Sequence, residues 1–259
     1  MIIDGRALAK EVLMRTKERA EKLPRPPKVI AYVAHNPALA TRSYVNIKKR
    51  SAEVAGCIFE ETSNLNFFQE TDAAIIQLPT TPEAMALLNQ IPIEKDADVL
   101  SSAAREKFER GDTDAILPPV VGAVKKILKI NGVELKGKRT VVIGNGFLVG
   151  APVAVWLRQQ GADVEIVTLE SGNLKRELLK ADIIVSGAGS PHLITPDMLI
   201  RGVMLIDAGT SESNGKVVGD AEPACAEKCS LFTPVPGGVG PLAVACLFEN
   251  VVALAERNA

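Results

Sequence analysis

The sequence lacks the features that mark nucleic-acid-binding and metal-binding proteins. Its 30 basic and 31 acidic residues leave a formal net charge of −1, whereas a non-specific nucleic-acid binder needs a basic surplus. The four cysteines, Cys57, Cys225, Cys229 and Cys246, form no CxxC pair and have no histidine at metal-ligand spacing. We therefore expect free thiols in a reducing cytoplasm, no metal site and no nucleic-acid partner.

Targeting and membrane signals are also scarce. The opening MIIDGRALAKEVL does not have the layout of a signal peptide. No uninterrupted apolar run approaches the roughly 18 residues that a membrane-spanning helix needs. Only two histidines occur, His35 and His192, and neither has the Ser/Asp or Cys partners of a hydrolase triad. The sequence thus favours a cytoplasmic protein without a membrane partner.

What the sequence does contain is a regular alternation of strand-like and helix-like segments. Apolar runs typical of strands cover 28–34, 57–62, 72–79, 139–144, 163–168, 182–189 and 203–209. Helical segments separate most of them, and Asp4 is a good N-cap for the first helix. The pattern predicts an α/β protein with parallel sheets, whose second half is a doubly wound, Rossmann-like domain. The Pro118-Pro119 pair marks the expected boundary between two domains.

A glycine-rich loop lies between a strand and a helix in the second half. VVIGNGFLVGAP (141–152) carries Gly144, Gly146 and Gly150, one residue more widely spaced than the commonest dinucleotide fingerprint. A tight turn explains the bare spacing equally well. The strand–loop–helix context favours a nucleotide, because glycines let a pyrophosphate approach the backbone at the positive end of a helix. Glycines at 187, 189 and 209 end two later strands, on the side where such sheets bind ligands.

The segment 41–51 places Tyr44 and Lys48 one turn apart on one helix face. A lysine beside an aromatic hydroxyl can do acid–base work if burial favours its neutral form. From the helix alone, a packed tyrosine beside a lysine with an exposed amine is the better explanation. Gln77 ends a buried strand and either faces a pocket or bonds the strand end. Asp96 and Asp98 belong to a turn or a helix cap.

The closing segment TPVPGGVGPLAVACLFEN (233–250) combines a stiff turn with an apolar helix. Residues 233–241 hold three prolines and three glycines, which fix a short and sharply turned path. Such a segment fits a rigid linker between domains, and it equally fits a backbone that a substrate approaches closely.

Together these motifs resemble the bifunctional methylenetetrahydrofolate dehydrogenase/methenyltetrahydrofolate cyclohydrolases over nearly the full length. The matching segments are IDGRALA (3–9), Ser43-Tyr44-Val45 with Lys48, IIQLP (75–79), EKDAD (94–98), VVIGNGFLVGAP, GVMLIDAGT (202–210), GKVVGD (215–220) and the closing segment. The closing segment is long and specific, and the others follow the family's order.

The resemblance implies two reactions in one cleft between two domains. Residues 1–118 with 241–259 would form a folate-binding catalytic domain, and 119–240 a Rossmann-like NAD(P)-binding domain. The first reaction oxidises 5,10-methylenetetrahydrofolate to the methenyl cation with NADP, and the second hydrolyses that cation to 10-formyltetrahydrofolate. Both belong to one-carbon metabolism, which supplies purine biosynthesis. Family members are generally homodimers joined through the Rossmann-like domain.

Site residues follow from the same resemblance. Lys48 is implied as the catalytic group, Tyr44 shapes the pocket, Gln77 interacts with Lys48, and Asp98 holds the pterin ring. The implied substrate-binding residues also include Pro236, Gly237 and Gly238. The implied cofactor-binding residues are Gly144, Asn145, Gly146, Val149, Gly150, Thr168, Gly187, Gly189, Gly209 and Thr210.

Several segments depart from the family pattern. The usual Gly-Arg-Ser of the cofactor loop is Gly144-Asn145-Gly146 here, and the second Rossmann strand is followed by Thr168-Leu169-Glu170. An acidic residue about 20 positions past the loop suits the ribose of NAD, whereas the resemblance favours NADP. The segments 62–72 and 99–121 also differ from the pattern.

Three alternatives stay open at this point. One is a member that keeps only the dehydrogenase activity. Another is a different two-domain NAD(P) dehydrogenase, such as a shikimate-type enzyme. The third is a folate- or nucleotide-binding protein that has lost catalysis.

Overall fold

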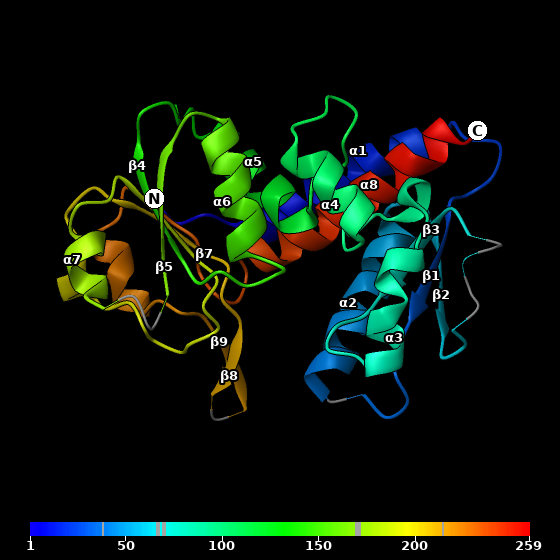
Figure 1. Ribbon diagram of the computed structural model, residues 1–259, viewed down its shortest axis with the longest axis horizontal. Helices are drawn as coiled ribbons and strands as arrows, with labels where there is room; N and C mark the ends of the chain where they lie inside the picture. The colour runs from blue at the N-terminus through cyan, green and yellow to red at the C-terminus, as the bar shows by residue number, and fades with distance from the viewer. Residues whose placement is uncertain (38, 66–67, 69–70, 169–171, 214) are drawn as a thin grey trace. The chain divides into compact units, whose positions relative to one another are not determined.

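The computed structural model describes the chain except residues 38, 66–67, 69–70, 169–171 and 214 (Figure 1). The chain divides into two compact units. The three-stranded unit comprises Ala9–Pro119 and Val244–Ala259, and the five-stranded unit comprises Met1–Leu8 and Val120–Ala243. Each is described by itself.

The three-stranded unit is built on a parallel sheet of order β2-β1-β3. Its strands are β1 (Lys28–Tyr32), β2 (Ile58–Thr62) and β3 (Ala73–Ile76). Its helices are α1 (Gly5–Ala20, from Ala9 on), α2 (Leu39–Val54), α3 (Pro82–Ala86), α4 (Ser102–Glu109) and α8 (Val239–Arg257, from Val244 on), with the 3₁₀ turns η1 (Leu88–Gln90) and η2 (Ile93–Lys95). All four residues of β3 are buried, as expected for a strand covered on both faces.

Helix α8 supplies much of the core of this unit. Phe248 is fully buried and meets Phe59 of β2 edge to face, with ring centroids 6.5 Å apart. Beside it lies α1 (Figure 1), and the Arg19 guanidinium donates two hydrogen bonds to the Glu256 carboxylate at 3.0 and 2.7 Å. By length and mean hydropathy α8 could span a membrane, although Glu249 and Asn250 interrupt its apolar run. Because 61% of its apolar window is buried inside the protein, its hydropathy is explained by core packing.

The five-stranded unit has the doubly wound order β10-β7-β6-β4-β5, with every pair parallel. Its strands are β4 (Arg139–Ile143), β5 (Asp163–Val167), β6 (Ile183–Ser186), β7 (Met204–Asp207) and β10 (Leu231–Phe232). Helices α5 (Pro119–Ile130), α6 (Gly150–Gln159) and α7 (Leu174–Leu178) connect them, together with the 3₁₀ turns η3 (Pro196–Met198) and η4 (Pro223–Glu227) and the hairpin β8 (Ser211–Ser213) and β9 (Lys216–Val218). The strand order reverses between β4 and β6, which is where such sheets bind ligands.

The chain start corrects one expected domain boundary. Residues 1–8 group with the five-stranded unit, although the sequence placed them in the folate domain. The physical reason is a set of backbone hydrogen bonds: Ile3 N–H donates to the Phe232 carbonyl, and Phe232 N–H donates to the Met1 carbonyl, both at 2.9 Å. The first residues thus pair with β10 at the sheet edge. Asp4 then caps α1 as expected, accepting from the N–H groups of Arg6 and Ala7.

All four cysteines are free thiols and buried. Burial raises the pKa of the Cys57 thiol and of the Cys225 thiol to about 12, and that of Cys229 to about 11.

These thiols give a first prediction. Because only the thiolate reacts, and because a pKa of about 12 leaves on the order of one thiol in ten thousand ionised at about pH 8, the native protein should react with an aromatic disulfide reagent at least about a hundredfold more slowly than the protein in denaturant. Absorbance of the released thiolate measures both rates. A fast-reacting thiol at Cys57, Cys225 or Cys229 in the native protein would contradict this burial.

Candidate functional site

Helix α2 presents Tyr44 and Lys48 on one side of the three-stranded unit. Val45 and Ala52 of the same helix are fully buried in the core, so they fix which face turns inward. Tyr44 is 36% exposed, while the Lys48 side chain is only 12% exposed. The tyrosine is therefore not the packed core residue that the helix alone suggested.

The structure brings Lys48 together with Asp98, 50 residues later in the chain. Lys48 Nζ lies 3.6 Å from Asp98 Oδ2, and the Asp98 side chain is 19% exposed. Both groups are thus largely, but not wholly, removed from solvent. A half-buried pair of this kind interacts more strongly than a surface ion pair.

Asp96 plays a different part from Asp98. It is buried, and its carboxylate accepts hydrogen bonds from the N–H of Leu100 at 3.1 and 3.0 Å and of Ser101 at 2.8 Å. Burial raises the pKa of Asp96, and the nearby Asp98 charge adds to that effect. Val99, which lies between Asp98 and Leu100, has φ +56°, a conformation that β-branched residues rarely adopt. Asp96 is therefore the turn former that the sequence left open.

Gln77 follows β3 and is buried. Its amide nitrogen donates to the Leu78 carbonyl at 2.8 Å, while its Oε1 atom is buried and accepts no hydrogen bond from the described residues. An unsatisfied buried acceptor is costly, so it suits a ligand or side chain that donates to it. The expected contact between Gln77 and Lys48 stays a prediction.

A hollow of about 600 Å³ occurs elsewhere on the three-stranded unit. It is lined by charged residues at the amino ends of the strands, including Arg25, Lys28 and Asp72. The Arg25 guanidinium donates to the Asp72 carboxylate at 2.7 and 2.9 Å, and Lys28 pairs with Glu60 at 3.0 Å. Because these charges neutralise one another and lie at the strand ends opposite Gln77, we assign the hollow no role in the chemistry.

The glycine loop occupies the switch point of the five-stranded sheet. Gly144 has φ +88°, and a Cβ there would lie 2.9 Å from the Gly187 carbonyl oxygen. A Cβ on Gly150 would lie 1.9 Å from the Gly144 carbonyl oxygen, and one on Gly187 would lie 2.4 Å from Val149 Cγ1. These three glycines therefore allow the loops after β4 and β6 to pack on the start of α6.

Gly146 differs, because a Cβ there would meet no atom within 4 Å. Packing thus does not explain this glycine, whereas close approach of a pyrophosphate to the backbone at the positive end of α6 would. Gly189, with φ +64°, is also open. Thr168 follows β5, Asn145 and Thr210 are exposed, and Glu170 lies outside the described residues.

Two buried carboxylates stabilise the loops at the carboxyl ends of these strands. The sequence reasoning missed both as site residues. The Asp220 carboxylate accepts from the Ser186 hydroxyl at 2.6 Å and from the N–H groups of Ala188 and Ser190, both at 2.8 Å. A Cβ on Gly209 would lie only 2.1–2.3 Å from that carboxylate. Asp220 therefore holds the loop containing Gly187 and Gly189, and packing against it explains Gly209.

Asp207 forms the second half of this arrangement. Its carboxylate accepts from the N–H groups of Gly209 and Ala221, both at 2.9 Å. A Cβ on Gly219 would lie 2.2 Å from Asp207 Oδ2. Burial, with the Asp220 charge nearby, raises the pKa of Asp207 to about 7. The sequence offered one sign of these two carboxylates: Gly209 lies two residues after Asp207, and Gly219 directly precedes Asp220.

Asp207 gives a second prediction, on the pH dependence of stability. The folded protein holds the Asp207 proton up to about pH 7, whereas the ordinary carboxyl value is 3.8. Its stabilising contribution is therefore complete below the ordinary value and is lost as pH rises through about 7, because the folded state binds the extra proton. We expect the free energy of unfolding of the wild type, relative to Asp207→Asn, to be larger at about pH 5 than at about pH 8. Urea unfolding of both proteins measures the difference, and a pH-independent difference would contradict the assignment.

The Pro/Gly segment turns the chain into α8 within the five-stranded unit. The Thr233 hydroxyl accepts from Asp207 N–H at 2.7 Å, and Gly237 has φ +111°. A Cβ on Gly5 would lie 1.8 Å from the Gly238 carbonyl oxygen. The opening and closing motifs of the sequence therefore pack directly on one another, which explains Gly5. A Cβ on Gly238 would lie 2.6 Å from the Pro234 carbonyl oxygen, so the tight turn explains that glycine. The substrate-binding role of Pro236 to Gly238 stays a prediction.

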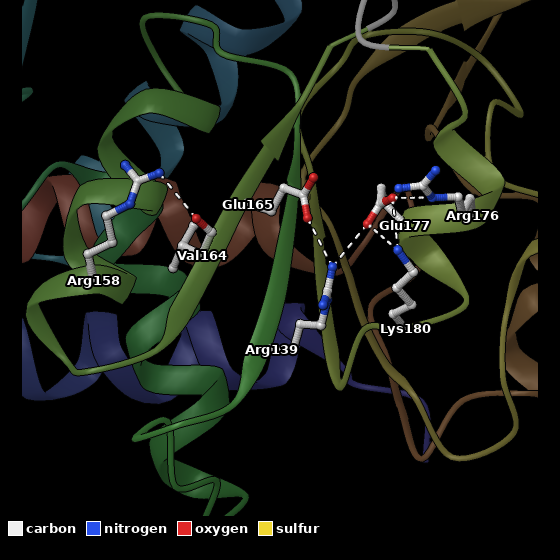
Figure 2. A network of polar contacts seen from close by, with 7 residues as sticks. All are labelled: Arg139, Arg158, Val164, Glu165, Arg176, Glu177 and Lys180. Carbon is white, nitrogen blue, oxygen red and sulfur yellow. Dashed lines mark hydrogen bonds and ion pairs between the residues drawn. The ribbon is translucent and has the colours of Figure 1, made fainter.

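A network of charged side chains surrounds Arg139 at the start of β4 (Figure 2). Arg139, at the amino end of β4, donates to Glu165 at 3.1 Å and to Glu177 at 3.0 Å. Glu177 also accepts from Arg176 and Lys180. Because the Arg139 and Glu165 side chains are 37% and 46% exposed, we assign this network to the solvated surface. Among the described residues, no group of three or more His, Cys, Asp or Glu side chains could hold a metal ion.

Comparison with known proteins assigns the family. A family model described as the NAD(P)-binding domain of tetrahydrofolate dehydrogenase/cyclohydrolase matches residues 118–259. The chain belongs to the tetrahydrofolate dehydrogenase/cyclohydrolase family. The bifunctional protein FolD of Azoarcus sp. is 34% identical, over 100% of this chain and 97% of the relative.

Solved structures agree with this family assignment. The bifunctional FolD enzyme of Campylobacter jejuni has a TM-score of 0.94 at 28% identity and covers 100% of this chain and 99% of that one. The Trypanosoma brucei methylenetetrahydrofolate dehydrogenase-cyclohydrolase, complexed with NADP cofactor and inhibitor, has a TM-score of 0.90 at 30% identity over 100% and 98%.

These comparisons confirm the family resemblance and the enzyme class expected from the sequence. They also confirm the α/β class with parallel sheets and a Rossmann-like NAD(P)-binding domain. Family membership also decides against a shikimate-type enzyme.

Proposed function

We propose that this protein oxidises 5,10-methylenetetrahydrofolate to 5,10-methenyltetrahydrofolate with NADP, and then hydrolyses the product to 10-formyltetrahydrofolate. Family membership supports the reaction pair, and the Azoarcus relative is named as bifunctional. The observation that carries the proposal for this chain is the half-buried Lys48 beside Asp98, because it offers an acid–base group next to a carboxylate.

Lys48 is the group we assign to hydrolysis. Water that adds to the methenyl carbon must lose a proton, and the amine that leaves as the ring opens must gain one. A neutral amine accepts a proton, and the positive charge of the methenyl substrate favours that neutral form by repulsion. Lys48 can therefore act as base and then as acid without leaving its place beside Asp98.

Asp98 and Tyr44 are assigned to the substrate. A carboxylate accepts hydrogen bonds from the amino group and ring N–H of a pterin in a geometry that a neutral acceptor cannot match. Tyr44 offers an exposed aromatic ring one turn from Lys48, which suits packing on the folate. Pro236, Gly237 and Gly238 are assigned as further substrate contacts.

The loop around Gly146 is assigned to NADP, which accepts the hydride when bound. The open backbone at Gly146, the glycines that pack the loop on α6, and the positive end of this helix fit a dinucleotide. Asn145, Val149, Thr168, Gly187, Gly189, Gly209 and Thr210 complete the assigned set. We further propose that the protein is a homodimer that supplies purine biosynthesis. We also propose a cytoplasmic location, because four free, buried thiols suit a reducing compartment.

Cofactor assays with methylenetetrahydrofolate test this assignment. The reduced nicotinamide formed with NADP and with NAD gives kcat/KM for each. We expect the larger kcat/KM with NADP. A strong preference for NAD would overturn the cofactor assignment alone, and no reduction of either would overturn the proposed function.

A further inference from the structure

The turn that carries Asp98 is irregular, lying between η2 and α4. Neither a strand ladder nor a helix fixes the direction of this side chain. The backbone around it must therefore be held by specific contacts if the carboxylate is to meet a ligand in one geometry. Asp96 supplies such contacts for the residues that follow Asp98, because its carboxylate accepts hydrogen bonds from the N–H groups of Leu100 and Ser101.

Asn250 of α8 holds the backbone just before Asp98. Its side-chain amide nitrogen donates to the Ala97 carbonyl and to the Leu117 carbonyl, both at 2.9 Å. The Ala97 carbonyl belongs to the peptide unit whose nitrogen is that of Asp98. Asn250 therefore fixes the orientation of the peptide plane from which Asp98 begins.

Both partners of Asn250 are carbonyl oxygens, so the position requires a donor with two N–H groups. Asparagine has this donor and aspartate does not. The residue itself is rigidly placed, because Phe248, Val251 and Val252 on the same helix are fully buried. The second carbonyl, that of Leu117, lies in the segment 99–121 that departs from the family pattern. Asn250 therefore also holds the backbone of this segment at Leu117.

We propose that Asn250 is a positioning residue for Asp98, which rests on the proposed function of Asp98 in folate binding. Asn250 touches no substrate in this account. It holds the Ala97–Asp98 peptide so that the carboxylate keeps one orientation beside Lys48. The expected signature of its loss is a higher KM for the folate, with kcat per folded enzyme and the KM for NADP almost unchanged.

A double-mutant cycle tests the proposal. Asp98→Asn should raise the KM for methylenetetrahydrofolate by about thirtyfold, within the range for losing a hydrogen bond to a charged group. Asn250→Ala should raise it by about fivefold to tenfold in the wild type and by less than about twofold in the Asp98→Asn background, because a residue that acts through Asp98 has nothing left to position. Asn258→Ala is the matched control, since the Asn258 side-chain amide also donates to a backbone carbonyl, that of Glu94 in η2, at 3.3 Å. It should leave both KM values unchanged.

The outcomes separate the two ideas. No effect of Asp98→Asn on the folate KM would refute the substrate role of Asp98, and with it the proposed part of the function. An effect of Asp98→Asn without one of Asn250→Ala, or an equal effect of Asn250→Ala in both backgrounds, would overturn the positioning role alone. If Asn250→Ala gives little folded protein, Asn250→Ser is measured in the same cycle, and an unchanged folate KM in that folded variant overturns the proposal.

Discussion

Replacing Lys48 by methionine should lower the hydrolysis of methenyltetrahydrofolate by about a thousandfold, in the range for losing a general acid–base group. Methionine keeps a long apolar side chain of similar reach in this position, where only 12% of the side chain is exposed. The fold should therefore survive, and the loss should fall on the chemical step. The decay of the methenyl absorbance, corrected for the uncatalysed rate, measures it.

The dehydrogenase step provides an internal comparison in the same variant. Hydride leaves the methylene carbon as the cation forms, so this step needs no proton acceptor. We expect Lys48→Met to keep most of its NADP reduction while hydrolysis is lost. Lys49→Met is the matched control, because Lys49 is exposed on the same helix, and it should keep both activities. Full cyclohydrolase turnover in Lys48→Met would refute the role assigned to Lys48.

The second large effect is expected at Gly150. A methyl group there would lie 1.9 Å from the Gly144 carbonyl oxygen and 2.7 Å from its carbonyl carbon, and backbone cannot yield as a flexible side chain can. Gly150→Ala should lower the free energy of unfolding by about 3 kcal/mol or more, at the upper end of measured overpacking costs. It should also weaken NADP binding, because the start of α6 is pushed away from β4. Urea unfolding and a fluorescence titration with NADP measure the two effects.

Gly146→Ala separates packing from ligand approach in the same loop. Since a methyl group at Gly146 meets no atom within 4 Å, its free energy of unfolding should stay within about 0.5 kcal/mol of the wild type. Its NADP affinity should nevertheless fall, because the added methyl lies where the pyrophosphate approaches. Wild-type stability and affinity in Gly150→Ala would contradict the packing account. Wild-type affinity in Gly146→Ala would contradict the ligand-approach account.

Features set by local pattern could be predicted from the sequence. The alternation of apolar strands with helices requires only neighbouring residues, and the glycine loop is recognised by its place between β4 and α6. Asp4 was identified as the cap of α1 for the same reason. In each case the physical cause, such as a cap or a periodicity, lies within a few residues of its effect.

Contacts between distant residues could not be derived this way. Nothing near Lys48 in the sequence indicates Asp98, and only the family resemblance pointed to both. The chain start was misassigned because its pairing partner, Phe232, lies more than 200 residues away. Asp220 and Asn250 were missed because their side chains bond to the backbone of distant loops. Such bonds have no periodicity, so a single sequence gives no signal for them.

Whether one chain performs both reactions can be decided by analysing the folate products. The protein is incubated with methylenetetrahydrofolate and NADP, and the folates are separated and quantified beside the NADPH formed. We expect 10-formyltetrahydrofolate in equal amount to NADPH, with little methenyltetrahydrofolate accumulating. If NADPH forms while methenyltetrahydrofolate accumulates and decays only at its uncatalysed rate, the chain is a dehydrogenase without the second activity and the proposal that one chain performs both reactions is contradicted.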